Sequence, residues 1–355
     1  MDRALRLAER GRGSTTPNPL VGAVVADAHG LVAGDGWHRR AGTPHAEVHA
    51  LDAAGERARG GTLYCTLEPC CHAGRTGPCV ARIAAAGIAR VVAATVDPNP
   101  RVSGGGFEYL RARGIAVEVG LRRREAVRQN APFFTMMREG RPFVIFKAAV
   151  SLDGRIAEAA GVRTTISGLE ARRGVQRLRA EVDAIAVGSG TLGVDDPLLT
   201  VREVFRGRPF TRVVFDRRLQ ASPAARVFGT LADGPVIVLT TRSAVEAQPA
   251  AAAALEAAGA SLEVLEDGSV AGAMRRLGEL GVSSLLLEGG AELGGAAWDA
   301  GMIDRVRLYV SPRPLGAAGV PLLAGRPLTA LGLWDVRVEQ CGDDVLIEGD
   351  VHRLD

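Results

Sequence analysis

The strongest chemical signal in the chain is a histidine, a glutamate and two cysteines at a spacing that suits zinc. His45-Ala46-Glu47 opens an expected helix, and Cys70 and Cys79 follow the next expected strand, each directly after a proline. One imidazole and two thiolates leave a tetrahedral Zn²⁺ with one open position, which is the layout of a catalytic zinc site. Water at that position has a lowered pKa, so hydroxide is available near neutral pH. Glu47 is placed to carry a proton between this water and a leaving group.

The His-x-Glu and Pro-Cys pattern is typical of zinc-dependent nucleobase deaminases, but the spacing of the cysteines differs. Those enzymes have two residues between the cysteines, whereas eight residues separate Cys70 from Cys79. Within this insert, Arg75 is suited to contact a substrate phosphate with its guanidinium group. The insert therefore predicts a loop that serves the substrate as well as the metal.

Other side chains near the motif compete for the role of metal ligand. Cys71 and His72 directly follow Cys70, and Cys70 is preferred only because a proline precedes it. His49 lies one helical turn beyond His45, on the same helix face. We interpret His49 as structural, because the glutamate is at the wrong offset for a His-Glu-x-x-His zinc motif.

Two glycine-rich turns in the second half are candidate phosphate-binding sites. Residues 188–193 fit G-x-G-x-x-G after an expected strand, and Asp216 ends a later strand 23 residues further on, as in a Rossmann fold. However, Asp195-Asp196-Pro197 follows at once, and proline is tolerated only in the first turn of a helix. The second turn, Gly289-Gly290, precedes an expected helix whose backbone N–H groups would bind phosphate, although an ordinary turn has the same sequence. Arg217-Arg218 would suit a cofactor 2′-phosphate or simply be solvated.

The elements that must position these residues alternate between strands and helices. Apolar runs predict strands at residues 20–25, 62–67, 90–96, 115–119, 143–150, 184–187, 212–215, 235–239, 262–265, 284–287 and 306–310. Helical patterns occur at residues 46–58, 80–86, 121–130, 250–260 and 291–300. This alternation implies an α/β layer architecture. We expect a domain boundary near residues 138–142, where Arg141-Pro142 precedes a new apolar strand.

Composition limits the class of protein. The chain has 355 residues, 47% hydrophobic and 23% charged, which predicts two globular domains. Forty-three basic and forty acidic side chains give a net charge of +3, so there is no general drive toward nucleic acid or an anionic membrane. No apolar run reaches the roughly 18 residues of a membrane span, and we expect no secretory signal, because the first residues include an early acid and no apolar region. Five cysteines, four within fifteen residues, favour metal or catalytic use in the cytosol, with Cys65 and Cys341 as core residues.

The sequence resembles the bifunctional riboflavin-biosynthesis deaminase/reductase family over nearly its whole length. In the first half the resemblance rests on Thr16-Pro17-Asn18-Pro19, Val21-Gly22, Gly36-Trp37-His38, Ala41-Gly42, Pro44-His45-Ala46-Glu47-Val48, Thr66-Leu67-Glu68-Pro69-Cys70-Cys71-His72, Gly74-Arg75-Thr76, Pro78-Cys79 and Asp97-Pro98-Asn99-Pro100. In the second half it rests on Lys147, Ser151-Leu152-Asp153-Gly154-Arg155-Ile156-Ala157, Arg179-Ala180, Thr191, Asp195-Asp196-Pro197-Leu198-Leu199-Thr200-Val201-Arg202 and Glu288-Gly289-Gly290. The chain departs from the family at Gly77, where proline is usual, and at Thr165, where tryptophan is common.

The resemblance implies an α/β protein of two domains and excludes a Rossmann fold. Residues 1–140 would form a cytidine-deaminase-like three-layer domain, a zinc-dependent pyrimidine deaminase. Residues 141–355 would form a dihydrofolate-reductase-like domain, an NADPH-dependent reductase. The implied cofactors are therefore Zn²⁺ and NADPH.

The resemblance also assigns roles to individual residues. Glu47 would be catalytic, His45, Cys70 and Cys79 would bind zinc, and Asn18, His38, His72 and Arg75 would line the pyrimidine and phosphate pocket. NADPH would be bound by Thr191, Asp195, Gly290, Ala291, Glu292, Leu293, Gly294, Gly295 and Ala296. The reductase substrate would be contacted by Lys147, Arg179, Leu199, Arg202 and Glu288, with Arg179 and Arg202 at its phosphate.

The implied activity has two steps. A diaminopyrimidinone ribosyl 5′-phosphate would lose ammonia to hydrolysis, and NADPH would then reduce the opened ribose to ribityl. We expect a homo-oligomer in the cytoplasm that acts on this small molecule and binds neither nucleic acid nor membrane. Two rival hypotheses are a nucleic-acid deaminase, which would need stacking aromatics although aromatic residues are only 4%, and a nucleotide-sensing protein with a closed structural zinc site, against which Glu47 argues.

Overall fold

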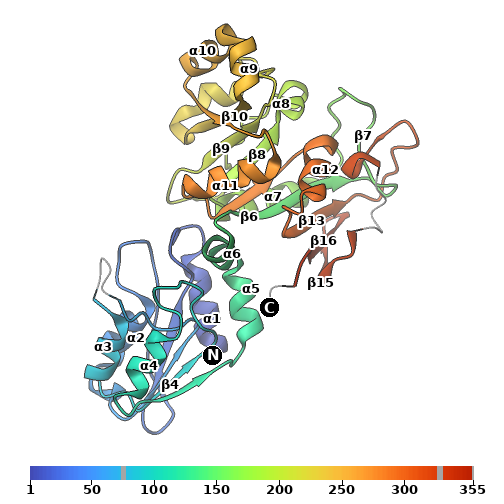
Figure 1. Ribbon diagram of the computed structural model, residues 1–355. Coiled ribbons are helices and arrows are strands. Elements are labelled where there is room, and N and C mark those ends of the chain that lie inside the picture. Colours follow the sequence, from blue (N-terminus) through green and yellow to red (C-terminus); the bar gives the residue numbers. More distant parts are fainter. Residues whose placement is uncertain (73–76, 326–330, 354–355) are drawn as a thin grey trace. The chain divides into compact units, whose positions relative to one another are not determined.

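The structure is a computed structural model, and it describes residues 1–72, 77–325 and 331–353 (Figure 1). The chain divides into two compact units, Met1–Gly140 and Arg141–Arg353. Both units contain a β-sheet with helices, in agreement with the predicted α/β architecture. None of the described helices has the length and apolar character needed to cross a membrane.

The first unit is built on a five-stranded sheet in the order β2-β1-β3-β4-β5. β1 pairs antiparallel with β2 and β3, and β3, β4 and β5 run parallel. The strands are β1 (Gly22–Ala26), β2 (Val32–Trp37), β3 (Thr62–Cys65), β4 (Arg90–Ala93) and β5 (Ala116–Val119). The α-helices are α1 (Asp2–Ala8), α2 (Ala46–Ala54), α3 (Cys79–Ala85), α4 (Gly105–Arg111), α5 (Arg123–Gln129) and α6 (Ala131–Glu139), and the 3₁₀ turns are η1 (Glu9–Gly11) and η2 (Gly55–Ala58).

Two glycines of β2 allow α2 to lie directly against the sheet. A Cβ atom added at Gly34 would be 2.4 Å from the carbonyl oxygen of Ala50. A Cβ atom at Gly36 would be 2.4 Å from the Cβ of His49. Because any side chain at these positions would push the helix away, the glycines fix the position of α2 and of His45 at its N-cap.

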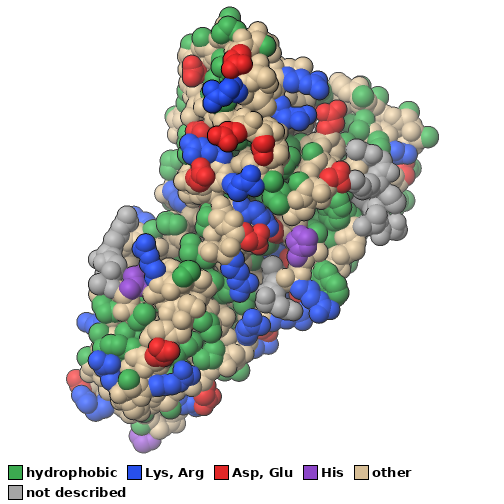
Figure 2. Space-filling model, viewed as in Figure 1, with side chains coloured by type: hydrophobic (Ala, Val, Ile, Leu, Met, Phe, Trp, Pro, Cys, Tyr) green, Lys and Arg blue, Asp and Glu red, His purple; other side chains and the backbone are tan. Residues whose placement is uncertain are grey.

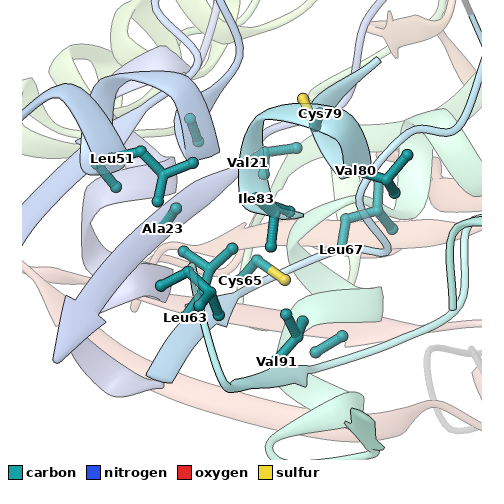
Figure 3. Packing of buried hydrophobic residues seen from close by; sticks show 14 of the residues in the cluster. Val21, Ala23, Leu51, Leu63, Cys65, Leu67, Cys79, Val80, Ile83 and Val91 are labelled. Carbon is teal, nitrogen blue, oxygen red and sulfur yellow. The ribbon is translucent and has the colours of Figure 1, made fainter. Parts of the chain in front are cut away.

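The core of the first unit forms where α2 and α3 pack on the sheet (Figure 3). Leu63 and Cys65 of β3 are fully buried, as are Val80 and Ile83 of α3. Cys79 is the first residue of α3, the same helix that packs Val80 and Ile83 into this core (Figure 3). The apolar face of α3 therefore anchors the helix end that carries one predicted metal ligand.

The second unit is built on a nine-stranded sheet in the order β11-β10-β9-β8-β12-β6-β13-β16-β15. All neighbours from β11 to β13 are parallel, whereas β13, β16 and β15 pair antiparallel. The strands are β6 (Phe143–Val150), β8 (Ala184–Gly188), β9 (Thr211–Phe215), β10 (Val236–Thr241), β11 (Ala260–Leu265), β12 (Ser284–Leu287), β13 (Arg305–Val310), β15 (Trp334–Cys341) and β16 (Asp344–Asp350). A separate small sheet pairs β7 (Arg155–Ala157) with β14 (Val320–Pro321).

The helices of the second unit occupy most of the connections between the parallel strands. They are α7 (Leu169–Glu181), α8 (Ser189–Asp195), α9 (Arg242–Ala247), α10 (Pro249–Ala257), α11 (Val270–Glu279) and α12 (Ala291–Asp299), with 3₁₀ segments η3 (Arg226–Asp233) and η4 (Leu322–Gly325). Parallel strands joined by helices place all strand carboxyl ends at one edge of the sheet. The glycine-rich turns after β8 and β12 therefore lie at the same edge.

The Rossmann interpretation of residues 188–193 is wrong, although the turn itself does join a strand to a helix. The antiparallel strands β16 and β15 extend the sheet on one side, which differs from the Rossmann strand order. Asp216, the acidic residue of the Rossmann-like pattern, is fully buried and accepts a hydrogen bond from the backbone N–H of Ala221 at 2.7 Å. It holds a turn after β9.

Candidate functional site

The three predicted metal ligands come together in the first unit. His45 is the N-cap of α2, Cys79 is the first residue of α3, and Cys70 lies in the segment after β3. The Nδ1 atom of His45 is 3.2 Å from the Sγ of Cys79 and 3.5 Å from the Sγ of Cys70. All three ligand atoms lie within 4.8 Å of one another. Zinc bonds of about 2.0–2.3 Å to nitrogen and sulfur fit such a group.

The charges of the group also suit a metal dication. A hydrogen bond with Cys79, together with the His45 imidazole, lowers the pKa of the Cys70 thiol to about 4. The same hydrogen bond and burial raise the pKa of the Cys79 thiol. The backbone N–H of Cys79 also donates to the Cys70 sulfur at 3.4 Å. A thiolate is thus already stabilised at Cys70, and a bound cation would remove the proton from Cys79 as well.

Glu47 lies in the same cavity as the metal group but has a different environment. It is buried, and burial raises the pKa of its carboxyl group. Its Oε2 atom has no hydrogen-bond partner among the described residues. Burying a carboxyl oxygen without a hydrogen-bond partner lowers the free energy of unfolding, unless a bound ligand supplies the hydrogen bond. The residues therefore fit a zinc ion with a water molecule that Glu47 contacts.

This first cavity has a volume of about 400 Å³ and receives several predicted substrate residues. Asn18, His38 and His72 line it together with His45, Glu47 and Cys70. Arg75 was also predicted here, but it lies outside the described residues. Of the competing metal ligands, Cys71 is directed elsewhere, with its sulfur 4.0 Å from the carbonyl oxygen of Arg101.

His38 and Asn18 form a fixed pair in the wall of this cavity. Burial lowers the pKa of His38, so the ring is neutral at physiological pH. Its Nδ1 atom lies 3.2 Å from the carbonyl oxygen of Pro44, and its Nε2 lies 3.0 Å from the amide nitrogen of Asn18. A neutral ring that donates to Pro44 must accept from Asn18. This arrangement leaves the Asn18 carbonyl oxygen as the acceptor for a ligand.

Two buried carboxylates beside this cavity were missed as functional residues. Glu68 accepts backbone N–H groups of Asp97, Gly104 and Gly106 at 3.2, 3.0 and 2.9 Å. Asp97 lines the cavity, and burial raises its pKa to about 6. Both belong to quoted motifs, yet only the fold brings the segment after β3 next to the segment after β4. Glu68 thereby joins the metal-binding segment to the segment that carries Asp97.

Replacing Gly106 with alanine tests this connection. A Cβ atom at Gly106 would be 2.2 Å from the carbonyl oxygen of Pro69, next to the metal ligand Cys70. Since a backbone atom must move, we expect the variant to lose about 2 kcal/mol of stability. Two measurements check this prediction: the free energy of unfolding from denaturant titration, and the amount of zinc that the variant retains. Gly77→Ala is the control, because nothing lies within 4 Å of its added Cβ, and equal stability of both variants would contradict the packing argument.

The second unit holds another cavity of about 400 Å³, at the carboxyl edge of its parallel strands. All five predicted substrate residues line it, namely Lys147, Arg179, Leu199, Arg202 and Glu288, together with the predicted cofactor residues Thr191, Asp195 and Gly290. Leu199 is buried with a positive φ of 51°, an unusual backbone conformation for leucine. The segment between α8 and β9 is thus held in a specific shape where it borders the cavity.

A buried ion pair joins two of these residues. The Nε and Nη2 atoms of Arg179 donate to the two carboxyl oxygens of Glu288 at 2.6 and 2.9 Å. The Nη1 atom donates to the carbonyl oxygen of Thr200 at 3.0 Å. Burial alone would raise the pKa of Glu288, but the charges of Arg179 and Lys147 lower it to about 2. Each guanidinium nitrogen of Arg179 donates a hydrogen bond within the protein, so its contact with a substrate phosphate stays a prediction. Arg202 is the more exposed of the two arginines predicted at the phosphate.

Lys147, a predicted substrate residue, also stands out in the composition of the chain. It is the single lysine of the chain, while every other residue in the basic count of 43 is arginine. Burial lowers the pKa of its ammonium group, and the charge of Glu288 opposes that shift. A lysine retained in a chain that otherwise uses arginine indicates a requirement for a compact ammonium donor.

The predicted cofactor segment begins at the N-terminus of α12. Gly290 is the N-cap and lines the cavity, and a Cβ atom there would be 3.3 Å from the Oγ1 of Thr191. Backbone N–H groups in this first turn can hold a phosphate, so the residues fit a dinucleotide. Gly294 lies one turn further on, where a Cβ atom would be 2.9 Å from the Phe146 ring. Gly294 therefore serves to pack α12 against β6, and the remaining predicted members, Ala291, Glu292, Leu293, Gly295 and Ala296, continue along the same helix.

Comparisons with known proteins agree with these two sites. The family described as "Cytidine and deoxycytidylate deaminase zinc-binding region" matches residues 1–95, and "RibD C-terminal domain" matches residues 142–347. The predicted deaminase-like first domain and reductase-like second domain are thus confirmed. The implied cofactors are Zn²⁺ and NADPH, and the substrate is a small pyrimidine compound.

Full-length relatives extend the match across both units. The chain is 42% identical over 343 residues to riboflavin biosynthesis protein RibD of Escherichia coli, covering 92% of this chain and 90% of that protein. It is 39% identical over 349 residues to the protein of the same name from Aquifex aeolicus, covering 98% and 96%. The crystal structure of a diaminohydroxyphosphoribosylaminopyrimidine deaminase/5-amino-6-(5-phosphoribosylamino)uracil reductase from Thermotoga maritima is 35% identical, with a TM-score of 0.85 and coverage of 99% and 97%. This chain therefore belongs to the RibD family of riboflavin biosynthesis, in which a zinc-dependent deaminase and a reductase share one chain.

Proposed function

We propose that the first cavity deaminates a diaminopyrimidinone ribosyl 5′-phosphate and that the second cavity reduces the ribosyl group of the product with NADPH. The observation that carries the proposal is the unpaired, buried Oε2 of Glu47 beside the His45, Cys70 and Cys79 group. A closed structural zinc site has no use for such a carboxyl group. The rival hypothesis of a zinc-binding sensor is therefore disfavoured.

In the deamination, Glu47 handles the protons. When bound, Zn²⁺ supplies the Lewis acidity that makes water nucleophilic near neutral pH. Glu47 accepts a proton at Oε2 from the attacking water as the water oxygen bonds to the ring carbon, and returns it to the exocyclic amine, so that the exocyclic C–N bond breaks and ammonia leaves. The pair of His38 and Asn18 orients the pyrimidine, and His72 lines the same pocket, while the phosphate contact that the sequence predicts for Arg75 lies outside the described residues.

In the reduction, the second cavity holds a charged substrate against the cofactor. When bound, NADPH supplies the hydride that converts the opened ribosyl group to ribityl. Glu288 is kept ionised by Arg179 and Lys147, so it can accept hydrogen bonds from sugar hydroxyls. Lys147 donates protons toward the reacting end, and Arg202 is the side chain that we assign to the phosphate.

The partners follow from this chemistry. We expect the cytoplasmic location and the homo-oligomer predicted from the resemblance, with no role for nucleic acid or membrane. On the visible face of the molecule, Lys and Arg side chains are mixed with Asp and Glu side chains (Figure 2). A mixed face supports a small-molecule substrate over a nucleic-acid strand, which prefers a continuous basic groove.

The direct test compares substrates on zinc-loaded protein. We expect ammonia from the diaminopyrimidinone ribosyl 5′-phosphate, a KM that is at least tenfold higher for the dephosphorylated compound, and none from cytosine or adenine in single-stranded DNA or RNA. A chelator should stop ammonia release without affecting reduction of the deaminated product. Equal turnover with and without the phosphate, or deamination of nucleic acid, would contradict the proposal.

The single lysine allows a second, independent prediction. An amine-acylating reagent can modify only Lys147 and the N-terminal amine. Burial lowers the pKa of Lys147, which increases the unprotonated, nucleophilic fraction of its amine at a given pH. We expect acylation of Lys147 to abolish reduction while ammonia release continues, and we expect NADPH with substrate to protect it. Peptide mass spectrometry reads the modified site. Full reductase activity in protein acylated at Lys147 would be inconsistent with its place in the cavity.

A further inference from the structure

Gln176 and Arg206, two side chains outside the predicted sites, hold the segment that carries Arg202 against α7. Leu199, Thr200 and Arg202 of this segment line the second cavity. The Oε1 atom of Gln176 accepts a hydrogen bond from the backbone N–H of Arg202 at 2.8 Å. Because the apolar face of α7 is buried in the second unit, the helix is a fixed support for this bond.

Arg206 fixes the other end of the same segment. Its Nη1 atom donates hydrogen bonds to the carbonyl oxygens of Arg179 at 3.0 Å and Ala180 at 2.8 Å. These carbonyls belong to the last turn of α7, where they have no partner within the helix and where the helix dipole favours a cation. Burial and the charge of Arg208 lower the pKa of Arg206 to about 10, so the guanidinium keeps its charge at physiological pH. Arg206 thus ties the segment to the helix end that carries Arg179.

The backbone around Arg202 is strained, and this strain needs the two contacts. Leu199 has a φ of 51° and Glu203 has a φ of 64°, both in the left-handed region. Residues other than glycine adopt this conformation at a cost in free energy and keep it only where the surrounding structure holds them. The bond from Gln176 lies between the two strained residues, and the bonds from Arg206 lie directly after them. Without these bonds the segment would relax, and Arg202 would lose its place in the cavity wall.

We propose that Gln176 and Arg206 are positioning residues of the reductase, which fix Arg202 where it binds the phosphate of the substrate. The inference rests on the proposed function, in which Arg202 contacts that phosphate. Neither Gln176 nor Arg206 is among the described residues that line the cavity, so each acts through the backbone of the segment. Loss of either side chain should therefore weaken binding of the phosphorylated substrate and leave the rate of hydride transfer unchanged.

The test is a double-mutant cycle between Gln176→Met and Arg202→Met in the full-length chain, read by steady-state reduction of the deaminated, phosphorylated substrate. We expect Arg202→Met to raise the KM for this substrate by about 30-fold, because a charged contact with the phosphate is lost. Gln176→Met should raise the same KM by about tenfold, with kcat within about twofold of wild type, because Arg202 is displaced. In the Arg202→Met background, Gln176→Met should add less than about twofold, because the two residues act through one contact.

A second variant and a matched control separate positioning from a general loss of structure. Arg206→Met removes the other contact and should raise the KM for the phosphorylated substrate by about fivefold or more. Arg177→Met makes the same replacement at an exposed position of α7, where the arginine charge acts on Tyr309 and Cys341, and it should behave like wild type. The KM for the dephosphorylated substrate and the KM for NADPH should stay within about twofold of wild type in every variant. Thermal unfolding of each variant reports folding.

The outcomes distinguish this inference from the proposed function on which it rests. If Arg202→Met leaves the KM for the phosphorylated substrate unchanged, the assignment of Arg202 to the phosphate is wrong, and the positioning role is overturned with it. If Arg202→Met raises that KM but Gln176→Met and Arg206→Met do not, the positioning role alone is wrong. It is also wrong if the effects of Gln176→Met and Arg202→Met multiply in full, or if the dephosphorylated substrate is affected equally.

Discussion

Replacing Glu47 with glutamine is expected to lower kcat/KM for ammonia release by about 10³-fold, which is within the range for loss of a general acid–base group. Glutamine has the same shape but cannot take up a proton. Its amide fits the buried position without a charge, so the variant should fold and keep its zinc. Reduction of the deaminated product should be unchanged, because that cavity lies in the other unit.

Glu68→Gln is the matched control for this experiment. Glu68 is also a buried carboxylate beside the first cavity, but both of its oxygens accept backbone N–H groups. Replacing Glu68 should reduce the free energy of unfolding by about 1–3 kcal/mol. The folded Glu68→Gln protein should still release ammonia much faster than Glu47→Gln. If Glu47→Gln kept its ammonia release within tenfold of wild type, the assigned proton transfer would be wrong.

Replacing Glu288 with glutamine should have the second large effect, and it should fall on the reductase alone. The change leaves Arg179 as a buried charge without its partner, which costs about 3–5 kcal/mol when an ion pair of this kind is broken. We expect kcat/KM for reduction to fall about 100-fold, because the carboxylate that we place at the substrate is lost. Ammonia release should continue at the wild-type rate.

The same variant makes a prediction about pH. Because the folded pKa of Glu288 is lowered from 4.5 to about 2, its stabilising contribution is present above pH 4.5 and is lost as pH falls through 2. The stability gap between wild type and Glu288→Gln should therefore close in acid. Asp304→Asn is the control, since the buried pair of Arg141 and Asp304 lies away from the cavity residues. Asp304→Asn should lose stability but keep the wild-type KM for NADPH. If Glu288→Gln kept the wild-type kcat/KM for reduction, the role assigned to Glu288 at the substrate would be contradicted.

The metal site was predictable because its chemistry is local. His45 and Glu47 lie within one helical turn, and the prolines before Cys70 and Cys79 mark the segments that carry the two thiols. The pair of Arg179 and Glu288 was not predictable from spacing, because 109 residues separate its members. The hydrogen bonds between Glu68 and the backbone N–H groups after β4 were likewise not predictable from spacing. Such contacts depend on which strands become neighbours, and no single stretch of sequence contains that information.

Local patterns also misled where tertiary structure decides. The G-x-G-x-x-G run at residues 188–193 forms the expected turn, but the strand order is set by the whole sheet and buries Asp216. The helix expected at residues 121–130 is present as α5, but the helix that follows it, α6, was missed; it begins at Ala131 and holds Pro132 in its first turn, where the missing N–H is harmless. The hairpin of β15 and β16 was missed, although residues 334–339 of β15 do alternate between apolar and polar side chains.

The measurement that tests the account most directly is a time course with both signals recorded together. Zinc-loaded protein would receive the diaminopyrimidinone ribosyl 5′-phosphate and NADPH, with ammonia and NADPH absorbance followed from mixing. The account predicts that ammonia appears without a lag and that NADPH absorbance falls only afterwards. With the amino substrate, Glu47→Gln should release no ammonia and oxidise no NADPH, and it should oxidise NADPH once it is given the deaminated product. Oxidation of NADPH before ammonia appears, or in the Glu47→Gln variant with the amino substrate, would contradict the assigned order and the assigned sites.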